Sequence, residues 1–324
     1  MKRNQFIRAA LGVVAGVALS ASVIAQPLSN RPIRVVVPFG PGGVADLTIR
    51  TVAQKMSENM GQPIVIENKP GAGGVVATDT VVKAAPDGHT LLLMSNGNAV
   101  SVGLFNSLPF DTVKDLAPVG VLGHFDLAIV VPADSRFKTL PELLAFAKAN
   151  PGKLNIASIN AGSTQNLAAE LFKTTAGIDA QVIPFNGSPA VITALRGGQV
   201  DAAVEILAPV LTQITGGGLR ALAVTGDKRA AALPNVPTAV EGGVAGFNVS
   251  SWNALAAPAR TPADIVVRLN KEANAALNDP ETRKKLANLN VDARPGTPQQ
   301  LADLLSSEIK RWSGVIDKAG IPKQ

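Results

Sequence analysis

Residues 33–46 read IRVVVPFGPGGVAD, and the order of structures that this stretch encodes decides the fold. The apolar run 33–37 is typical of a short buried strand. A glycine-rich turn follows, and apolar side chains then recur at helical spacing until the chain reaches Gly61. A strand that leads directly into a helix begins a β-α-β unit, so we expect a parallel sheet covered by helices.

The glycine-rich turn itself predicts an anion site. Gly40, Gly42 and Gly43 have no side chains, so backbone N–H groups can face a ligand at the start of the helix. The helix dipole favours negative charge at the same point. Asp46 lies in the first helical turn, where it either stabilises that turn or contacts the ligand through water.

Strands and helices alternate along the chain in two blocks. The first block has strands at 33–37, 64–66 and 90–94, and the second has strands at 154–157, 181–183, 200–204 and 219–224. The segments 119–131 and 247–257 bracket the second block, as expected for two strands that cross between blocks. We therefore predict an α/β protein of two lobes, each a mainly parallel sheet flanked by helices, with a two-strand hinge.

The crossing segments also predict the lobe boundaries. Residues 26–125 and 252–324 are expected to form a discontinuous first lobe, and residues 126–251 the second. The last helix begins after Thr297 with Gln300 three positions later, and it buries an apolar stripe that includes Trp312. We place this helix on the first lobe.

The first residues predict a secretory signal peptide. Lys2, Arg3 and Arg8 precede or flank an apolar run at 9–18, and small residues end at Ala25. No later segment offers about 20 uninterrupted apolar residues, the length that a membrane-spanning helix needs. We expect residues 1–25 to be removed and the mature chain to be exported.

The composition excludes several kinds of chemistry. The chain has no cysteine, no tyrosine and 2 histidines, which leaves no thiolate and very little for a zinc site or a histidine-based triad. The net charge of +6 falls once the basic leader is removed, and it is too weak to indicate nucleic acid binding. We expect no cofactor, no metal and no nucleic acid partner.

The loops that follow the strands share one chemistry. Ligands of open α/β sheets bind beyond the carboxyl ends of the strands, and these loops carry glycine, hydroxyl and amide groups but no lysine or arginine: 40–43, 95–98, 160–164 and 185–188. Aligned neutral donors bind a carboxylate without a salt bridge. The sequence therefore predicts a carboxylate ligand whose affinity depends little on salt.

Three other features have competing interpretations. His124 and Asp126 are two positions apart on a predicted strand, which suggests an acid/base pair, but no serine, cysteine or second histidine completes it. Trp252 either stacks on an aromatic ligand or packs in the hinge. The loop 67–74, reading ENKPGAGG, is expected to pack a helix closely rather than touch a ligand.

Six segments in order resemble the periplasmic substrate-binding proteins of tripartite tricarboxylate transporters, often called Bug receptors. They are PIRVVVPFGPGGVAD, VIENKPGAGG followed by AAPDGHTLLL, FKTLPELLAFAKANPGKLNIAS, LRGGQVDAAV, LRALAV and GFNVSSWNALAAPARTP. The likeness covers nearly the whole chain after the leader. It implies a periplasmic binding protein of type II, a Venus flytrap that closes over a small carboxylate and presents it to a membrane permease.

The resemblance also implies which residues line the ligand. In these receptors the first loop and Asp46 hold one carboxylate through backbone and water, and Glu205 matches an acidic position. The implied ligand-lining residues are Phe39, Gly40, Gly42, Gly43, Asp46, Ser95, Asn96, Ser163, Thr164, Phe185, Gly187 and Glu205. The family more often has aspartate at position 205, serine and histidine near Gln165 and Asn166, and tyrosine at His89. Glu205 would repel a carboxylate unless it bonds an ammonium, a hydroxyl or water.

We therefore predict a periplasmic receptor rather than an enzyme. Its ligand is expected to be a dicarboxylate, a tricarboxylate, an acidic amino acid or an aromatic acid. Its protein partners are expected to be integral-membrane permease subunits, and the receptor itself is expected to be a monomer. One alternative keeps the ligand but signals through a sensor kinase ectodomain. Another is an exported enzyme that uses His124 and Asp126.

Overall fold

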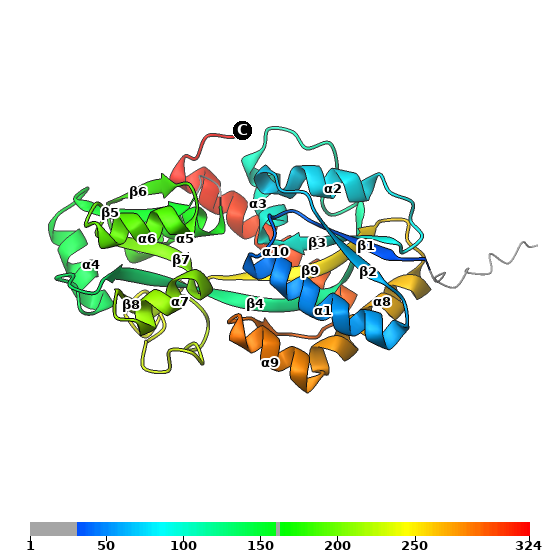
Figure 1. Ribbon diagram of the computed structural model, residues 1–324. Helices are drawn as coiled ribbons and strands as arrows, with labels where there is room; N and C mark the ends of the chain where they lie inside the picture. Colours follow the sequence, from blue (N-terminus) through cyan, green and yellow to red (C-terminus); the bar gives the residue numbers. More distant parts are fainter. Residues whose placement is uncertain (1–30, 160–162) are drawn as a thin grey trace, which may run out of the picture.

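The computed structural model describes residues 31–159 and 163–324 (Figure 1). The predicted leader at 1–25 and residues 160–162 of the predicted loop 160–164 lie outside these residues. The strands are β1 (Ile33–Val37), β2 (Ile64–Asn68), β3 (Thr90–Ser95), β4 (Leu116–Pro132), β5 (Leu154–Ile159), β6 (Ala180–Phe185), β7 (Ala202–Ile206), β8 (Leu219–Val224), β9 (Ser250–Pro258) and β10 (Asp292–Ala293). The helices are α1 (Val44–Met60), α2 (Val75–Val82), α3 (Asn96–Leu104), α4 (Leu140–Ala149), α5 (Thr164–Ala176), α6 (Ser188–Arg196), α7 (Leu207–Thr215), α8 (Ala263–Asn278), α9 (Pro280–Asn288) and α10 (Pro298–Ala319), with a short 3-10 turn, η1 (Ala72–Gly74), before α2.

The strands form one sheet in the order β2-β1-β3-β9-β4-β7-β5-β6, and β10 and β8 pair with β4 outside this path. β1 pairs in parallel with β2 and β3, and β5 pairs in parallel with β6 and β7. Among the described strands, every antiparallel pair includes β4 or β9. The predicted two-lobed α/β fold with parallel sheets is confirmed, and antiparallel pairing is confined to the crossing strands and their partners.

β4 and β9 connect the two lobes. They pair from Leu116↔Pro258 to Asp126↔Ser250, and from Leu127 onward β4 pairs with β7 and β8 instead. β4 is 17 residues long, so a single strand belongs to both parts of the sheet. The lobe boundaries at 125/126 and 251/252 stay a prediction.

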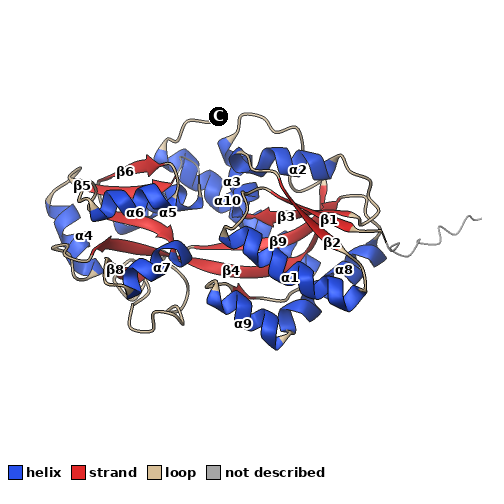
Figure 2. Ribbon diagram, viewed as in Figure 1, coloured by secondary structure: helices blue, strands red, loops and turns tan. Residues whose placement is uncertain are grey.

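Helices cover both faces of the sheet (Figure 2). Val35 and Val37 of β1 face the core beneath α1, α8 and α9, whereas Val36 faces the core beneath α2, α3 and α10, because successive strand residues point to opposite faces. The second of these cores continues past the hinge to α4 and α5. α10 contacts α3 of the first lobe, as expected, but it also contacts α5 and so reaches both lobes.

Helix starts follow the sequence signals in part. Thr297 and Gln300 form the predicted reciprocal cap of α10. Residues 95–98, expected as a loop, are instead the cap and first turn of α3, because Ser95 and Asn98 satisfy each other's backbone N–H groups. Within the described part of the chain, no helix combines the length and apolar composition that crossing a membrane requires.

Candidate ligand-binding site

A buried carboxylate holds the glycine-rich loop. Asp46 is 1% exposed, and its Oδ2 accepts hydrogen bonds from the Gly42 backbone N–H and from Arg50 Nε, each at 2.9 Å. Its Oδ1 accepts from Asn68 Nδ2 at 2.8 Å, and the same amide group donates to the Phe39 carbonyl at 2.9 Å. Gly42 has a φ of 85°, which glycine adopts without strain. Asp46 therefore shapes the loop itself.

These bonds keep Asp46 charged. Burial alone would raise the pKa of Asp46, but hydrogen bonds from Arg50, Gly42 and Asn68 outweigh burial and hold the pKa below its usual value. The Arg50 guanidinium is committed to Asp46 and to Asn68 Oδ1, the latter at 3.0 Å. α1 starts after Gly43 with no side-chain cap, so its N-terminus suits an anion that supplies the missing acceptor.

The two lobes touch where α3 and α5 begin. Asn96, the first residue of α3, is fully buried, and its Nδ2 donates to Thr164 Oγ1 at 3.1 Å. Thr164 is the first residue of α5, whose start is fixed by Ser163: the Ser163 hydroxyl accepts from the Asn166 backbone N–H at 3.1 Å. Two residues predicted to line the ligand, Asn96 and Thr164, thus contact each other directly.

The second lobe contributes two further helix starts. β6 ends at Phe185, and α6 begins after Gly187, which has a φ of 87° and provides no side-chain cap. α7 begins directly after β7 and is likewise uncapped by a side chain. Figure 1 shows that the ends of β6 and β7 point toward the first lobe, and that the end of β3 points back toward the second. Facing helix starts are suited to an anionic ligand.

Glu205 at the end of β7 is only partly satisfied. It is 0% exposed, and its Oε1 accepts from Gln165 Nε2 at 2.9 Å and from the Ile206 backbone N–H at 2.8 Å. Its Oε2 makes no hydrogen bond of good geometry to a described residue. Burial raises the pKa of Glu205, although Gln165, the Ile206 N–H and the Ser188 hydroxyl favour the charged form.

Several predicted residues lie close together, and others were not foreseen. The structure directly joins Asn96 to Thr164, Asp46 to Gly42, and Glu205 to Gln165. The loop 67–74 packs closely on a helix, as expected, since a Cβ on Gly73 would lie 3.0 Å from Ser101 of α3. Sequence reasoning missed Arg50, although its spacing of four from Asp46 is a recognisable signal. It also missed Asn68, which follows from tertiary pairing of β1 and β2.

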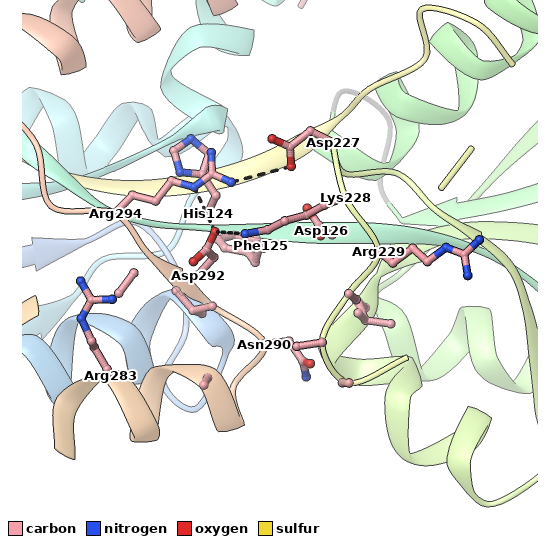
Figure 3. A pocket seen from close by; sticks show the side chains of 17 residues that line it. His124, Phe125, Asp126, Asp227, Lys228, Arg229, Arg283, Asn290, Asp292 and Arg294 are labelled. Carbon is pink, nitrogen blue, oxygen red and sulfur yellow. Dashed lines mark hydrogen bonds and ion pairs between the residues drawn. The ribbon is translucent and has the colours of Figure 1, made fainter. Parts of the chain in front are cut away.

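A cavity of about 410 Å³ lies between the lobes at the hinge (Figure 3). None of the predicted ligand-lining residues, all of which the structure describes, lines it; His124 and Asp126 of β4 do. Ion pairs cross its rim: Lys228 Nζ lies 3.3 Å from Asp292, and Arg294 lies 3.9 Å from Asp227. These pairs link the loop after β8 to the β10 segment.

His124 and Asp126 titrate abnormally in this cavity. Burial lowers the pKa of His124 to about 4, and the charge of Arg294 adds to that effect. Burial raises the pKa of Asp126 to about 6, with Asp227 contributing in the same direction. The Nδ1 of His124 is buried without a hydrogen bond to any described residue. No described serine or cysteine lines the cavity, so the pair has no nucleophile beside it.

Two lobes joined by two crossing strands, each with parallel strands and helices on both faces, define a two-lobed periplasmic binding protein. The chain belongs to the tripartite tricarboxylate transporter family of receptors, whose model matches residues 48–321. This family consists of substrate-binding receptors, so the prediction of a receptor rather than an enzyme is confirmed.

Individual relatives agree with this assignment. BugT of Bordetella pertussis is 37% identical over 315 residues, which cover 96% of this chain and 97% of BugT. Rpa4515 of R. palustris, solved with adipate, has a TM-score of 0.81 and 32% identity, covering 91% of this chain and 99% of that one. MatC of Rhodopseudomonas palustris, solved with malate, has a TM-score of 0.76 and 34% identity, covering 88% and 99%.

Proposed function

We propose that this receptor binds a small carboxylate between its lobes and delivers it to the membrane permease of a tripartite tricarboxylate transporter. One observation carries the proposal: α1, α6 and α7 begin at facing strand ends without side-chain caps. Such helix starts leave backbone N–H groups for an anion, and the dipoles favour its charge. The adipate of Rpa4515 and the malate of MatC are ligands of the corresponding chemistry.

The remaining parts of the proposal concern setting and partners. We infer that residues 1–25 direct export to the periplasm and are cleaved near Ala25, and that the mature chain acts as a monomer. We propose that the ligand is lined by the twelve residues that the resemblance implies, of which Phe39 is the first and Glu205 the last along the chain. The ligand class is a dicarboxylate or tricarboxylate, an acidic amino acid or an aromatic acid, and permease subunits are the protein partners.

A thermal-shift screen tests ligand binding. The chain from residue 26 onward is unfolded, refolded to remove bound ligand, and heated with malate, adipate, citrate, aspartate or nicotinate. A ligand that binds the folded state raises the melting temperature, and the rise grows with ligand concentration. At a ligand concentration of a hundred times Kd, the free energy of unfolding increases by about 2.7 kcal/mol. Adipamide is the matched control for adipate, because it has the same length and no charge. Stabilisation by adipamide but by none of the carboxylates would contradict the proposal.

Delivery needs a separate test. Deleting the gene should abolish cellular uptake of the carboxylate found in the screen, and the wild-type chain should restore it. Undiminished uptake in the deletion strain would contradict delivery while leaving binding intact, and a signalling output would then be examined by transcription of ligand-dependent genes.

A further inference from the structure

A chain of hydrogen bonds runs from the C-terminal helix to the contact between the lobes. Trp312 Nε1 donates to Asn96 Oδ1 at 2.8 Å and to Glu308 Oε2 at 2.7 Å. Asn96 Nδ2 donates onward to Thr164 Oγ1 at 3.1 Å. Trp312 and Asn96 are 0% exposed and Glu308 is 8% exposed, so water does not compete easily for these bonds.

The indole group fixes which way the Asn96 amide faces. An indole N–H can only donate, so the atom of Asn96 that meets it has to be the oxygen. The amide nitrogen then necessarily lies on the other side, toward Thr164. If the indole N–H were lost, the Asn96 amide could rotate by half a turn and turn its oxygen toward Thr164. The bond between the lobes would then form only when the Thr164 hydroxyl donates instead of accepting, so its direction would no longer be fixed.

The backbone around Trp312 is well anchored against α3. A Cβ added to Gly103 of α3 would lie 2.8 Å from the Ser313 hydroxyl, so the two helices pack closely at that point. The chain end is tied to α3 as well, because Gln324 N donates to the Leu104 carbonyl at 2.8 Å. Arg311 of the same helix donates to the Asn248 carbonyl, just before β9. α10 is therefore a fixed support from which Trp312 acts.

We propose that Trp312 is a positioning residue for closure of the receptor. Its indole N–H, shared between Asn96 and Glu308, orients the Asn96 amide so that this amide joins the first lobe to Thr164 of the second. Asn96 and Thr164 belong to the site of the proposed function, and the inference rests on that function only for its biological use. The interlobe bond joins protein atoms only, so its strength can be measured in the ligand-free protein.

The chain offers a matched control. Trp252 is also buried, at 1% exposed, but its Nε1 has no hydrogen-bond partner among the described residues. Trp312→Phe and Trp252→Phe thus remove the same atoms from similar depths, and only the first removes a bonded N–H. Thr164→Val removes the acceptor at the other end of the chain of bonds and leaves the core of α10 untouched.

Interlobe distance is the primary measurement. The natural chain has no cysteine, so spin labels are placed uniquely with Val267→Cys on α8 and Val240→Cys after β8, sites that are 64% and 48% exposed. Pulsed electron spin resonance on refolded, ligand-free protein then gives the populations of short and long distances. We expect Thr164→Val to lower the closed-to-open ratio about fivefold, the effect of one neutral hydrogen bond. Trp312→Phe should lower the ratio by less, because the Thr164 hydroxyl can still donate to a rotated Asn96 amide. Trp252→Phe should lower it least of the three, because its N–H makes no hydrogen bond to a described residue that could be lost.

The double variant separates positioning from general loosening. If Trp312 acts through Asn96 on Thr164, Trp312→Phe adds nothing to the opening caused by Thr164→Val. The two indole N–H resonances provide an independent signature, since Thr164→Val should shift that of Trp312 and leave that of Trp252 in place. Equal opening by Trp312→Phe and Trp252→Phe, additive opening in the double variant, or an unmoved Trp312 resonance would overturn the inference. Each outcome is independent of whether a carboxylate binds.

Discussion

Asp46 and Glu205 are both buried carboxylates from the predicted ligand-lining set, and their hydrogen bonds differ. Asp46 receives three hydrogen bonds, from Gly42, Arg50 and Asn68, and has little left for a ligand. Glu205 receives its bonds on Oε1 and leaves Oε2 without a partner of good geometry among the described residues. Asp46 therefore shapes the glycine-rich loop, whereas Glu205 keeps an oxygen that no described residue bonds with good geometry, and in the proposed site it is the carboxylate whose protonation a ligand would change.

Asp46→Ala should destabilise the fold far more than a typical helix-start substitution. It leaves a backbone N–H, a guanidinium and an amide without their acceptor, so we expect a loss of about 3 kcal/mol in the free energy of unfolding. Asp264→Ala is the control, because Asp264 is an exposed acid in the first turn of α8 and should lose less than about 1 kcal/mol. Urea denaturation measures both. Equal losses would contradict the role of Asp46.

His124 and Asp126 should make the free energy of unfolding depend on pH in opposite directions, and the two effects nearly cancel. The His124 pKa falls from 6.5 to about 4 on folding, so the unfolded state binds this proton first. The free energy of unfolding therefore decreases as pH falls from 6.5 to about 4. The Asp126 pKa rises from 3.8 to about 6 on folding, so the folded state keeps this proton longer. The free energy of unfolding therefore decreases as pH rises from 3.8 to about 6. Each shift corresponds to about 3 kcal/mol.

Replacing either residue alone should reveal the pH dependence that the other one causes. The unfolding free energy of His124→Asn should fall as pH rises from about 4 to 6, and that of Asp126→Asn should fall as pH drops from about 6.5 to 4. Glu205 has a raised pKa and adds to the first slope in all variants, so differences from the wild type are compared. Parallel profiles for the two variants would show that the cavity does not shift these groups.

Local elements followed from the sequence because their causes are local. The apolar runs, glycine stops and proline-containing starts predicted most helices and strands, and the start of α10 at Thr297 with Gln300 is confirmed. The start of α4 shows how far such signals reach. Thr139 accepts from the Glu142 N–H, but Glu142 bonds the Lys138 N–H, so no reciprocal box forms. Thr261 stands two residues before α8 in a similar sequence, but its hydroxyl is buried and makes no hydrogen bond to the described residues.

Contacts between elements that are far apart in the sequence could not be predicted from local patterns. The stripe on α10 predicted that Trp312 is buried, but its partner Asn96 lies 216 residues away and no periodicity encodes that pairing. The hinge cavity was equally hidden, since its walls come from β4, the loop after β8, α9 and β10. His124 and Asp126 were recognised as neighbours on one strand face, and only the fold shows what surrounds them.

Ser163→Ala tests whether the start of α5 serves the site as well as the helix. Removing this N-cap should cost about 1 kcal/mol of stability. Thr139→Ala removes the N-cap of α4 and should cost about as much. Only Ser163→Ala should also weaken binding of the carboxylate from the thermal-shift screen, because α5 begins at the Asn96 contact. Calorimetry that shows equal affinities for both variants would contradict a role for α5 in binding.

On the scale of the whole molecule, no free basic side chain in the described part of the chain is available at the predicted ligand-lining residues. The ion pairs between the lobes, Lys228 with Asp292 and Arg294 with Asp227, involve exposed side chains and are worth little in water. Arg50, beside the first loop, is already bound to Asp46. Ligand affinity should therefore depend on backbone and neutral donors from two lobes rather than on a free basic side chain.

Salt titration checks this expectation. Raising the ionic strength about tenfold should change the Kd for the bound carboxylate by less than about threefold, since buried hydrogen bonds are screened weakly. Lys228→Met, which breaks one exposed interlobe pair, should leave Kd equally unchanged. A steep loss of affinity with salt would mean that a basic side chain contacts the ligand directly.

The position of β9 constrains the order in which this molecule can assemble. β9 lies between β3 and β4 in the sheet, although some 120 residues separate it from the end of β4 along the chain. Until that strand arrives, a nascent chain has β3 and β4 as two open edges, each able to pair with another molecule. The strands β5 to β8 follow one another along the chain, so they can pair early. Completion of the first lobe is thus a late, long-range step, and the interval before it is when aggregation is most probable.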